Sequence, residues 1–256
     1  MDCAIEKIPL SGKHTAYLKI DLHDDFLKRM VSRLSALSKP WVIAFEDVKS
    51  LQEFGGFEVS NDLCVFPPFD LLPFEQVEGS IPTLKKRMKT LYRLGGPDRF
   101  TGGILTTIPA LLQKIVDPGA LVEGCLTYKK GGFIRDNRGD KYDRESLIQY
   151  LSETGYRRAY TVENPGEFSV RGFILDYFSL FDDFPKRIEF FDDEINDVRF
   201  FDPQTQLSLS KETDAREGSK LPEGQSVIVP FRETFFKEEN WEHFRNRITD
   251  LKKKYL

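Results

Sequence analysis

Residues 24–45 read DDFLKRMVSRLSALSKPWVIAF, and this stretch decides the fold class. From Asp24 to Leu37 the apolar residues recur every three or four positions, which predicts an amphipathic helix. Pro40 then ends the helix, because a proline disfavours helical backbone at the residue before it. The next five residues, Trp41–Phe45, form a short apolar run typical of a strand buried on both faces of a parallel sheet.

The same alternation of helix and strand continues to about residue 116. Further strands are predicted at Leu63–Phe66 and Gly103–Thr107. Three helices are indicated between and after these strands by apolar residues at helical spacing. The first carries Val48, Leu51 and Phe54, and the second carries Leu84, Met88 and Leu91 and ends at Gly95-Gly96-Pro97. The third begins at Pro109 and carries Leu111, Leu112 and Ile115. Residues 1–116 are therefore predicted to form an α/β domain with a parallel sheet.

From Cys125 onward short strand-like runs dominate, with one clear helix among them. That helix is predicted at Asp143–Leu151, with Asp143 as its N-cap and Gly155 just past its end. The predicted strands are Arg158–Val162, Phe168–Phe178, Lys186–Phe191 and Val198–Asp202. Residues 125–215 are therefore predicted to be a smaller, inserted α+β domain, which residues 117–124 connect to the first domain.

The end of the chain predicts a return to the first domain. Between Leu209 and Gln225 the sequence is polar and almost without large apolar residues, as in a mobile linker. A strand follows at Ser226–Val229, and Trp241, Phe244, Ile248 and Leu251 then recur at helical spacing. Residues 216–256 are expected to form a linker, a strand and a C-terminal helix that pack on the first domain.

Composition narrows the class of protein. The chain has 256 residues, 40% of them hydrophobic and 30% charged, which fits a soluble globular protein of one large or two smaller domains. A net charge of -4 gives no general attraction to nucleic acid. Three well-separated cysteines favour a reducing cytoplasm over a disulfide framework or a zinc site. No signal segment or membrane-spanning run is expected.

A phosphate-binding loop is the first catalytic motif to consider, at Ser11-Gly12-Lys13-His14-Thr15. Such a loop needs a glycine five residues before the Gly-Lys pair and a Ser or Thr directly after the lysine. Lys7 and His14 stand at those two places. The motif is therefore degenerate, and we expect no nucleotide hydrolysis.

Other catalytic constellations are equally incomplete. The cluster Asp192-Asp193-Glu194 follows an apolar run and is interpreted as a charged turn between two strands; a glycosidase-type acid pair stays open, but acidic residues are too numerous to single one out. His14, His23 and His243 share no metal-ligand spacing and lie near no nucleophile motif. We therefore predict no catalytic residue, no metal ligand and no cofactor-binding residue.

Two stretches carry a family resemblance: GYRRAYTVENPGEFSVRGFILDYF at residues 155–178 and PKRIEFFDDEINDVRFFDPQTQ at residues 185–206. They resemble the amino-terminal UvrB-homology module of the bacterial transcription-repair coupling factor Mfd. Upstream, FPPFDLLPFE, RMKTLYRL and LLQKIVDP are similar to the same family, so the resemblance extends with gaps from about Trp41 to Gln206. The polar segment 135–141 is not part of the family pattern and is expected to be a loop.

The resemblance implies a UvrB-like α/β domain with a degenerate nucleotide site, carrying an α+β domain that docks on UvrA. The implied function is non-catalytic recruitment of UvrA in transcription-coupled nucleotide excision repair. UvrB itself has an intact phosphate loop and a long aromatic hairpin, which this chain lacks. In a longer parent protein, an ATP-dependent DNA translocase, the contacts with RNA polymerase and DNA would be made by parts outside this sequence.

The docking residues that the resemblance implies are Arg171, Arg187 and Phe191. Arginine and aromatic residues are enriched at interface hot spots, and Arg187 and Phe191 are four apart on one predicted strand, hence on one face. The alternative is that Arg171 pairs internally with Asp176 or Glu167 and only holds the fold together.

Two further functions remain open from the sequence. One is a UvrB-type damage-recognition protein that binds ATP and DNA. The other is a DNA-binding element, which the basic run Lys85-Lys86-Arg87 favours and the net charge of -4 disfavours.

Overall fold

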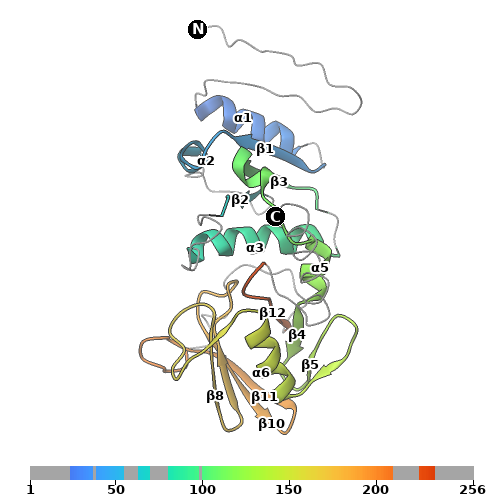
Figure 1. Cartoon of the computed structure of the whole chain (residues 1–256), viewed down its shortest axis with the longest axis vertical. Coiled ribbons are helices and arrows are strands. Elements are labelled where there is room, and N and C mark those ends of the chain that lie inside the picture. The colour runs from blue at the N-terminus through green and yellow to red at the C-terminus, as the bar shows by residue number, and fades with distance from the viewer. Residues whose placement is uncertain are drawn as a thin grey trace, which may run out of the picture.

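The computed structural model describes residues 24–36, 39–54, 63–69, 80–97, 100–209 and 225–233. Figure 1 shows two helices above a small parallel sheet, a long helix beneath it, and a second unit of sheets below that helix. The upper part contains α1 (Asp24–Ser35), β1 (Trp41–Phe45), α2 (Val48–Phe54), β2 (Leu63–Phe66), α3 (Ile81–Gly95), β3 (Gly103–Thr107) and α4 (Ile108–Leu112). This order confirms the predicted strands of the first layer and the helices α1, α2 and α3. The helix that was expected to carry Leu111, Leu112 and Ile115 is shorter than predicted, because α4 ends at Leu112 and leaves Ile115 outside it.

The three strands of the upper layer are parallel, in the order β1-β3-β2. The central strand β3 carries the fully buried Leu105, and the side chains of Trp41 and Phe45 pack with it against α1 and α2. One expectation was wrong: β1 is not buried on both faces. It pairs with β3 alone among the described strands, and the side chain of Val42 is 54% exposed.

The lower part begins with α5 (Pro118–Glu123), a short helix that the sequence did not predict; Asp117 caps it by accepting a hydrogen bond from the backbone N–H of Ala120. The remaining elements are β4 (Leu126–Lys129), β5 (Ile134–Arg135), β6 (Lys141–Tyr142), α6 (Arg144–Glu153), β7 (Arg157–Arg158), β8 (Glu167–Arg171), β9 (Ile174–Tyr177), β10 (Lys186–Phe191), β11 (Glu194–Phe200) and β12 (Gln225–Ile228). They form a five-stranded sheet, β11-β10-β9-β8-β7, and a four-stranded sheet, β12-β4-β5-β6.

Three predicted elements of this part differ in the structure. The strand expected over Phe168–Phe178 is a hairpin of β8 and β9, because Gly172 adopts a positive φ of 58° and turns the chain back. The strand expected over Arg158–Val162 is only the two-residue β7. The segment 135–141 is a loop as predicted over residues 136–140, but its two end residues belong to β5 and β6, which pair and make it the turn of a hairpin; the Asn137 side chain donates to the carbonyl oxygen of Val122.

The strand that was expected to return to the first domain pairs instead with β4, antiparallel, and so belongs to the four-stranded sheet. The chain reaches the upper layer directly afterwards, because the carboxylate of Glu233 binds the guanidinium of Arg87 on α3. Both side chains are almost fully buried. The expected linker at residues 210–224 and the C-terminal helix lie outside the described residues, and the domain boundaries stay a prediction.

The Arg87 guanidinium is enclosed on all sides. It lies over the rings of Phe66 and Phe69, at 4.2 and 3.8 Å from their centroids, and donates to the carbonyl oxygen of Pro67 at 2.6 Å. The side-chain oxygen of Gln113 accepts a further hydrogen bond from it at 3.3 Å. This ion pair therefore joins α3 and the segment after β12, and with them the two layers.

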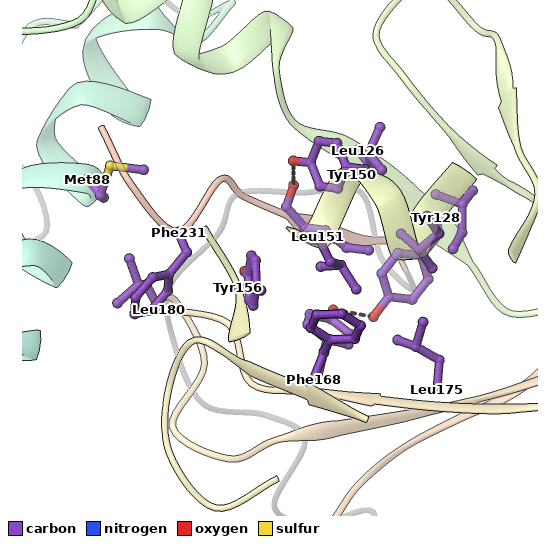
Figure 2. Packing of buried hydrophobic residues seen from close by; sticks show 14 of the residues in the cluster. Met88, Leu126, Tyr128, Tyr150, Leu151, Tyr156, Phe168, Leu175, Leu180 and Phe231 are labelled. Atoms are coloured by element: carbon purple, nitrogen blue, oxygen red, sulfur yellow. Dashed lines mark hydrogen bonds between the residues drawn. The ribbon is translucent and has the colours of Figure 1, made fainter. Parts of the chain in front are cut away.

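One hydrophobic core runs through both layers (Figure 2). It extends from Met88 on α3, past Phe231 and Leu180, to Phe168 and the rest of the inner face of the five-stranded sheet. The same core contains Leu147 and Leu151, which form the inner face of α6. None of the described helices is long and apolar enough to cross a membrane.

Candidate functional site

The five-stranded sheet has two unlike faces. Its inner face carries the core residues Phe168, Leu175, Tyr177, Ile188 and Phe190. Because side chains alternate along a strand, the outer face carries a set of mostly polar residues, which we call the arginine face: Ser169, Arg171, Asp176, Arg187, Glu189, Phe191 and Arg199. All three residues expected at the docking surface lie on this face, so the structure brings them together.

Asp176 is the centre of the arginine face. Its side chain is 1% exposed, and it accepts hydrogen bonds from two arginines. Arg187, its direct neighbour on β10, donates through Nε at 2.7 Å and through Nη2 at 2.9 Å. Arg171, at the end of β8, donates through Nη2 at 2.6 Å. A buried carboxylate is thus shared by two guanidinium groups, which fixes both in place.

The two arginines differ in what they can offer to a partner. The side chain of Arg187 is 15% exposed and also lies 4.6 Å from the centroid of the Phe201 ring. Its hydrogen bonds with Asp176 raise the pKa of Arg187 further above the usual arginine value, so it stays charged throughout. The side chain of Arg171 is 49% exposed. Arg171 can therefore touch another molecule directly, whereas Arg187 mainly supports the site.

Phe191 is the exposed end of β10. Its side chain is 79% exposed, and the residue after it, Asp192, turns the chain with a positive φ of 56°. The hairpin closes at the pair Phe191 and Glu194, which confirms that Asp192-Asp193-Glu194 is a charged turn between two strands. A large apolar side chain held at a tight turn loses little freedom on binding, so this geometry suits a protein contact.

A row of ion pairs continues the arginine face towards β11. Arg199 binds the carboxylate of Glu189 across the strands and lies 3.6 Å from that of Asp197. Asp197 in turn accepts a 2.6 Å hydrogen bond from the Lys130 ammonium. These groups are largely exposed, and such pairs contribute little to stability. They give the face an alternating pattern of positive and negative charge.

At the edge of the sheet away from β11, the arginine face is bordered by the segment between β7 and β8. The Ser169 hydroxyl donates to the carbonyl oxygen of Tyr160 at 2.9 Å, and the Tyr160 side chain is 91% exposed. Sequence reasoning did not find Tyr160, because it placed this residue inside a regular strand. A cue was present in Asn164-Pro165-Gly166, a turn signal that shortens any strand before it.

Glu167 holds the segment between β7 and β8 in place. Its carboxylate accepts hydrogen bonds from the backbone N–H groups of Glu163 and Asn164, both at 2.9 Å, and from the Arg157 guanidinium at 2.7 Å. Burial alone raises the pKa of Glu167, but these donors outweigh burial, so the pKa is lowered from its ordinary value of 4.5. The charged form of Glu167 is therefore the one that stabilises the fold.

We expect Glu167→Gln to lower the free energy of unfolding at neutral pH by about 1–3 kcal/mol, because the amide cannot accept all of these hydrogen bonds. A depressed folded-state pKa contributes stability above pH 4.5, which is lost as the pH falls through the folded value. Urea unfolding of both proteins between pH 7 and pH 3 should show the difference between them shrinking. Burial raises the pKa of Asp182 in both proteins. Its titration therefore changes both free energies of unfolding equally and leaves their difference unchanged. A difference that stayed constant with pH would contradict this role.

Of the two internal partners that the sequence suggested for Arg171, Asp176 and Glu167, the structure shows one. Arg171 does bind Asp176, while Glu167 binds Arg157 instead. Pairing inside the fold does not exclude a partner contact, because about half of the Arg171 side chain stays accessible.

Little in the described residues suggests catalysis. The turn from β1 to α2 is Glu46-Asp47, and Asp47 itself accepts the Ser50 N–H at 2.8 Å. Within the described part of the chain, no three His, Cys, Asp or Glu side chains lie together as metal ligands do. Cys64 and Cys125 are buried, and neither forms a disulfide bond within the described residues. The residues of the degenerate phosphate motif and all three histidines lie outside the described ranges.

Comparison with known proteins places the arginine face within a conserved family model. The model named UvrB interaction domain matches residues 134–216. The chain is also similar to transcription-repair-coupling factors: it is 34% identical to that of Myxococcus xanthus over 175 residues, covering 68% of this chain and 13% of the relative. It is 36% identical to the transcription-repair-coupling factor of Staphylococcus aureus, covering 88% of this chain and 20% of the relative. It is 28% identical to that of Escherichia coli, covering 71% of this chain and 15% of the relative. The chain therefore spans at most about a fifth of the length of these relatives.

Proposed function

We propose that this chain, which belongs to the transcription-repair coupling factor family and carries a UvrB interaction domain, is a non-catalytic module that binds UvrA in transcription-coupled repair. The observation that carries the proposal is the arginine face. It lies within the matched residues 134–216, and it combines two arginines with an exposed phenylalanine on one rigid sheet.

The residues of the face would have different roles in binding. Phe191 would insert its ring into an apolar pocket of UvrA, because aromatic residues in desolvated pockets supply much of the energy of an interface. Arg171 would bind a carboxylate of the partner while keeping its contact with Asp176. Arg187 would act through Asp176, which it holds in place.

A non-catalytic role also agrees with the junction of β1 and α2. In α/β layers that bind nucleotides, a glycine-rich loop between a strand and a helix offers backbone N–H groups to phosphate. This junction has Glu46-Asp47 in place of a glycine-rich loop, and the Asp47 carboxylate itself accepts the N–H of Ser50. Contacts with RNA polymerase and DNA would belong to other parts of a longer parent protein.

The proposal is tested by measuring the affinity of the full chain for purified UvrA by calorimetry. We expect Arg171→Ala and Phe191→Ala each to weaken binding by about 2 kcal/mol, the size of a hot-spot contact. Neither substitution should lower the melting temperature much, because Phe191 is exposed and Asp176 keeps Arg187 when Arg171 is removed.

Matched controls are available on the same domain. Arg138→Ala removes an exposed arginine from the β5–β6 turn. Phe173→Ala removes a phenylalanine of the turn between β8 and β9, which is 65% exposed and whose ring contacts Arg144 of α6 rather than either arginine of the docking surface. Both controls should bind UvrA as the parent does. If Arg171→Ala and Phe191→Ala also bind unchanged, the docking surface lies elsewhere.

A further inference from the structure

We infer that Tyr160 is a second apolar contact for the partner, at the edge of the arginine face opposite to β11, and that Leu207 supports it. This inference rests on the proposed function and extends it, because it adds residues to the three docking residues that the resemblance implies. The observation is the exposure of both side chains, 91% for Tyr160 and 69% for Leu207.

The hydrogen bonds place Tyr160 beside the arginines. Ser169, whose hydroxyl donates to the Tyr160 carbonyl oxygen, is the direct cross-strand neighbour of Asp176. Asp176 is in turn the neighbour of Arg187. Tyr160 thus lies at one end of the row formed by Ser169, Asp176 and Arg187.

The backbone around Tyr160 is fixed although its ring is free. The N–H of Ala159 donates to the carbonyl oxygen of Phe168 at 2.8 Å, and Val162 is fully buried with Phe178 and Phe201. Glu167 binds the two residues that follow Val162. A tyrosine has few side-chain torsions to immobilise, so a ring on such a backbone costs little entropy when it binds.

Leu207 lies close to the same segment. The Gln206 side chain, one residue before it, donates to the carbonyl oxygen of Val162 at 3.2 Å. Leu207 is itself held by the hydrogen bond from the Asp202 N–H to its carbonyl oxygen. The two exposed apolar side chains therefore project from neighbouring, fixed segments.

The spacing of these groups fits a single partner. Phe191 is four residues beyond Arg187 on β10, about 13 Å at the rise of a strand. Tyr160 is three strand positions away from Arg187 across the sheet, about 14 Å at the usual strand separation. An interface of standard size covers such an area. The partner surface that fits is a carboxylate opposite Arg171 with an apolar pocket on either side of it.

An exposed aromatic residue is by itself ordinary, so the test must separate Tyr160 from a bystander. Affinity for UvrA is measured by calorimetry for the full chain with Tyr160→Ala, Tyr160→Phe, Phe173→Ala and Arg171→Ala. We expect Tyr160→Ala to weaken binding about tenfold, as loss of an interface contact does, and Tyr160→Phe to restore the parent affinity because the ring is retained. Phe173→Ala should change nothing.

The outcomes distinguish this inference from the proposed function. If Arg171→Ala weakens binding while Tyr160→Ala does not, the second contact is overturned and the function stands. If Tyr160→Phe loses as much as Tyr160→Ala, the ring is not the contact and the inference is also overturned. If Arg171→Ala has no effect either, the arginine face is not the docking surface, and the proposed function loses the observation that carries it. Melting temperatures should be unchanged for all four variants, because these side chains lie largely in solvent.

Discussion

Replacing Arg87 by alanine should lower the free energy of unfolding by about 3–5 kcal/mol, the usual cost of leaving one member of a buried ion pair without the other. Glu233 is almost fully buried and would keep an uncompensated charge. The substitution would also remove the packing of the guanidinium between the rings of Phe66 and Phe69. Because the pair joins α3 to the segment after β12, the loss should loosen the contact between the two layers.

Urea unfolding of Arg87→Ala, Glu233→Ala and the double variant measures this effect. The double variant should be less destabilised than the sum of the single variants, because it leaves no unpaired charge. Lys85→Ala is the matched control on α3: its ion pair with Asp183 is partly exposed, so its removal should cost less than about 1 kcal/mol. Equal losses for Lys85→Ala and Arg87→Ala would show that burial of the pair contributes nothing.

The sequence predicted the upper layer well because its signals are local. Periodic apolar residues, Pro40 and the glycines after α3 each act within a few residues, and the parallel sheet followed from their alternation. The errors arose where one residue changes the path of the chain. Gly172 with its positive φ turned one predicted strand into the hairpin of β8 and β9. The exposure of Val42 depends on what covers the sheet, which no local pattern encodes.

The candidate site was predictable to the same extent. Four-residue spacing correctly placed Arg187 and Phe191 on one face of one strand. The pairing of Arg171 with Asp176 was one of the alternatives that the sequence left open. The second arginine on the same carboxylate was not predictable, because Asp176 meets Arg187 only through the pairing of β9 with β10. That pairing decides which arginine is buried and which is accessible. No local pattern indicates how exposed each of the two arginines is, and the structure separates their roles.

Asp176 should therefore be the most sensitive residue of the arginine face. We expect Asp176→Ala to lower the free energy of unfolding by about 3–5 kcal/mol, because it leaves the largely buried Arg187 without its counter-charge. UvrA binding should weaken as well, since both guanidinium groups lose the acceptor that orients them. Arg171→Ala, by contrast, should weaken binding with little loss of stability.

The double variant Asp176→Ala/Arg187→Leu separates the buried charge from the rest of the site. Removing both charges and filling the space with an apolar side chain should recover much of the stability, because a buried ion pair often contributes little more than apolar packing would. Affinity for UvrA should not recover, because Arg171 still lacks the carboxylate that positions its guanidinium. Urea unfolding and calorimetry on the same samples measure the two effects. Recovery of affinity together with stability would mean that Asp176 serves only the fold, and that Arg171 meets its partner without it.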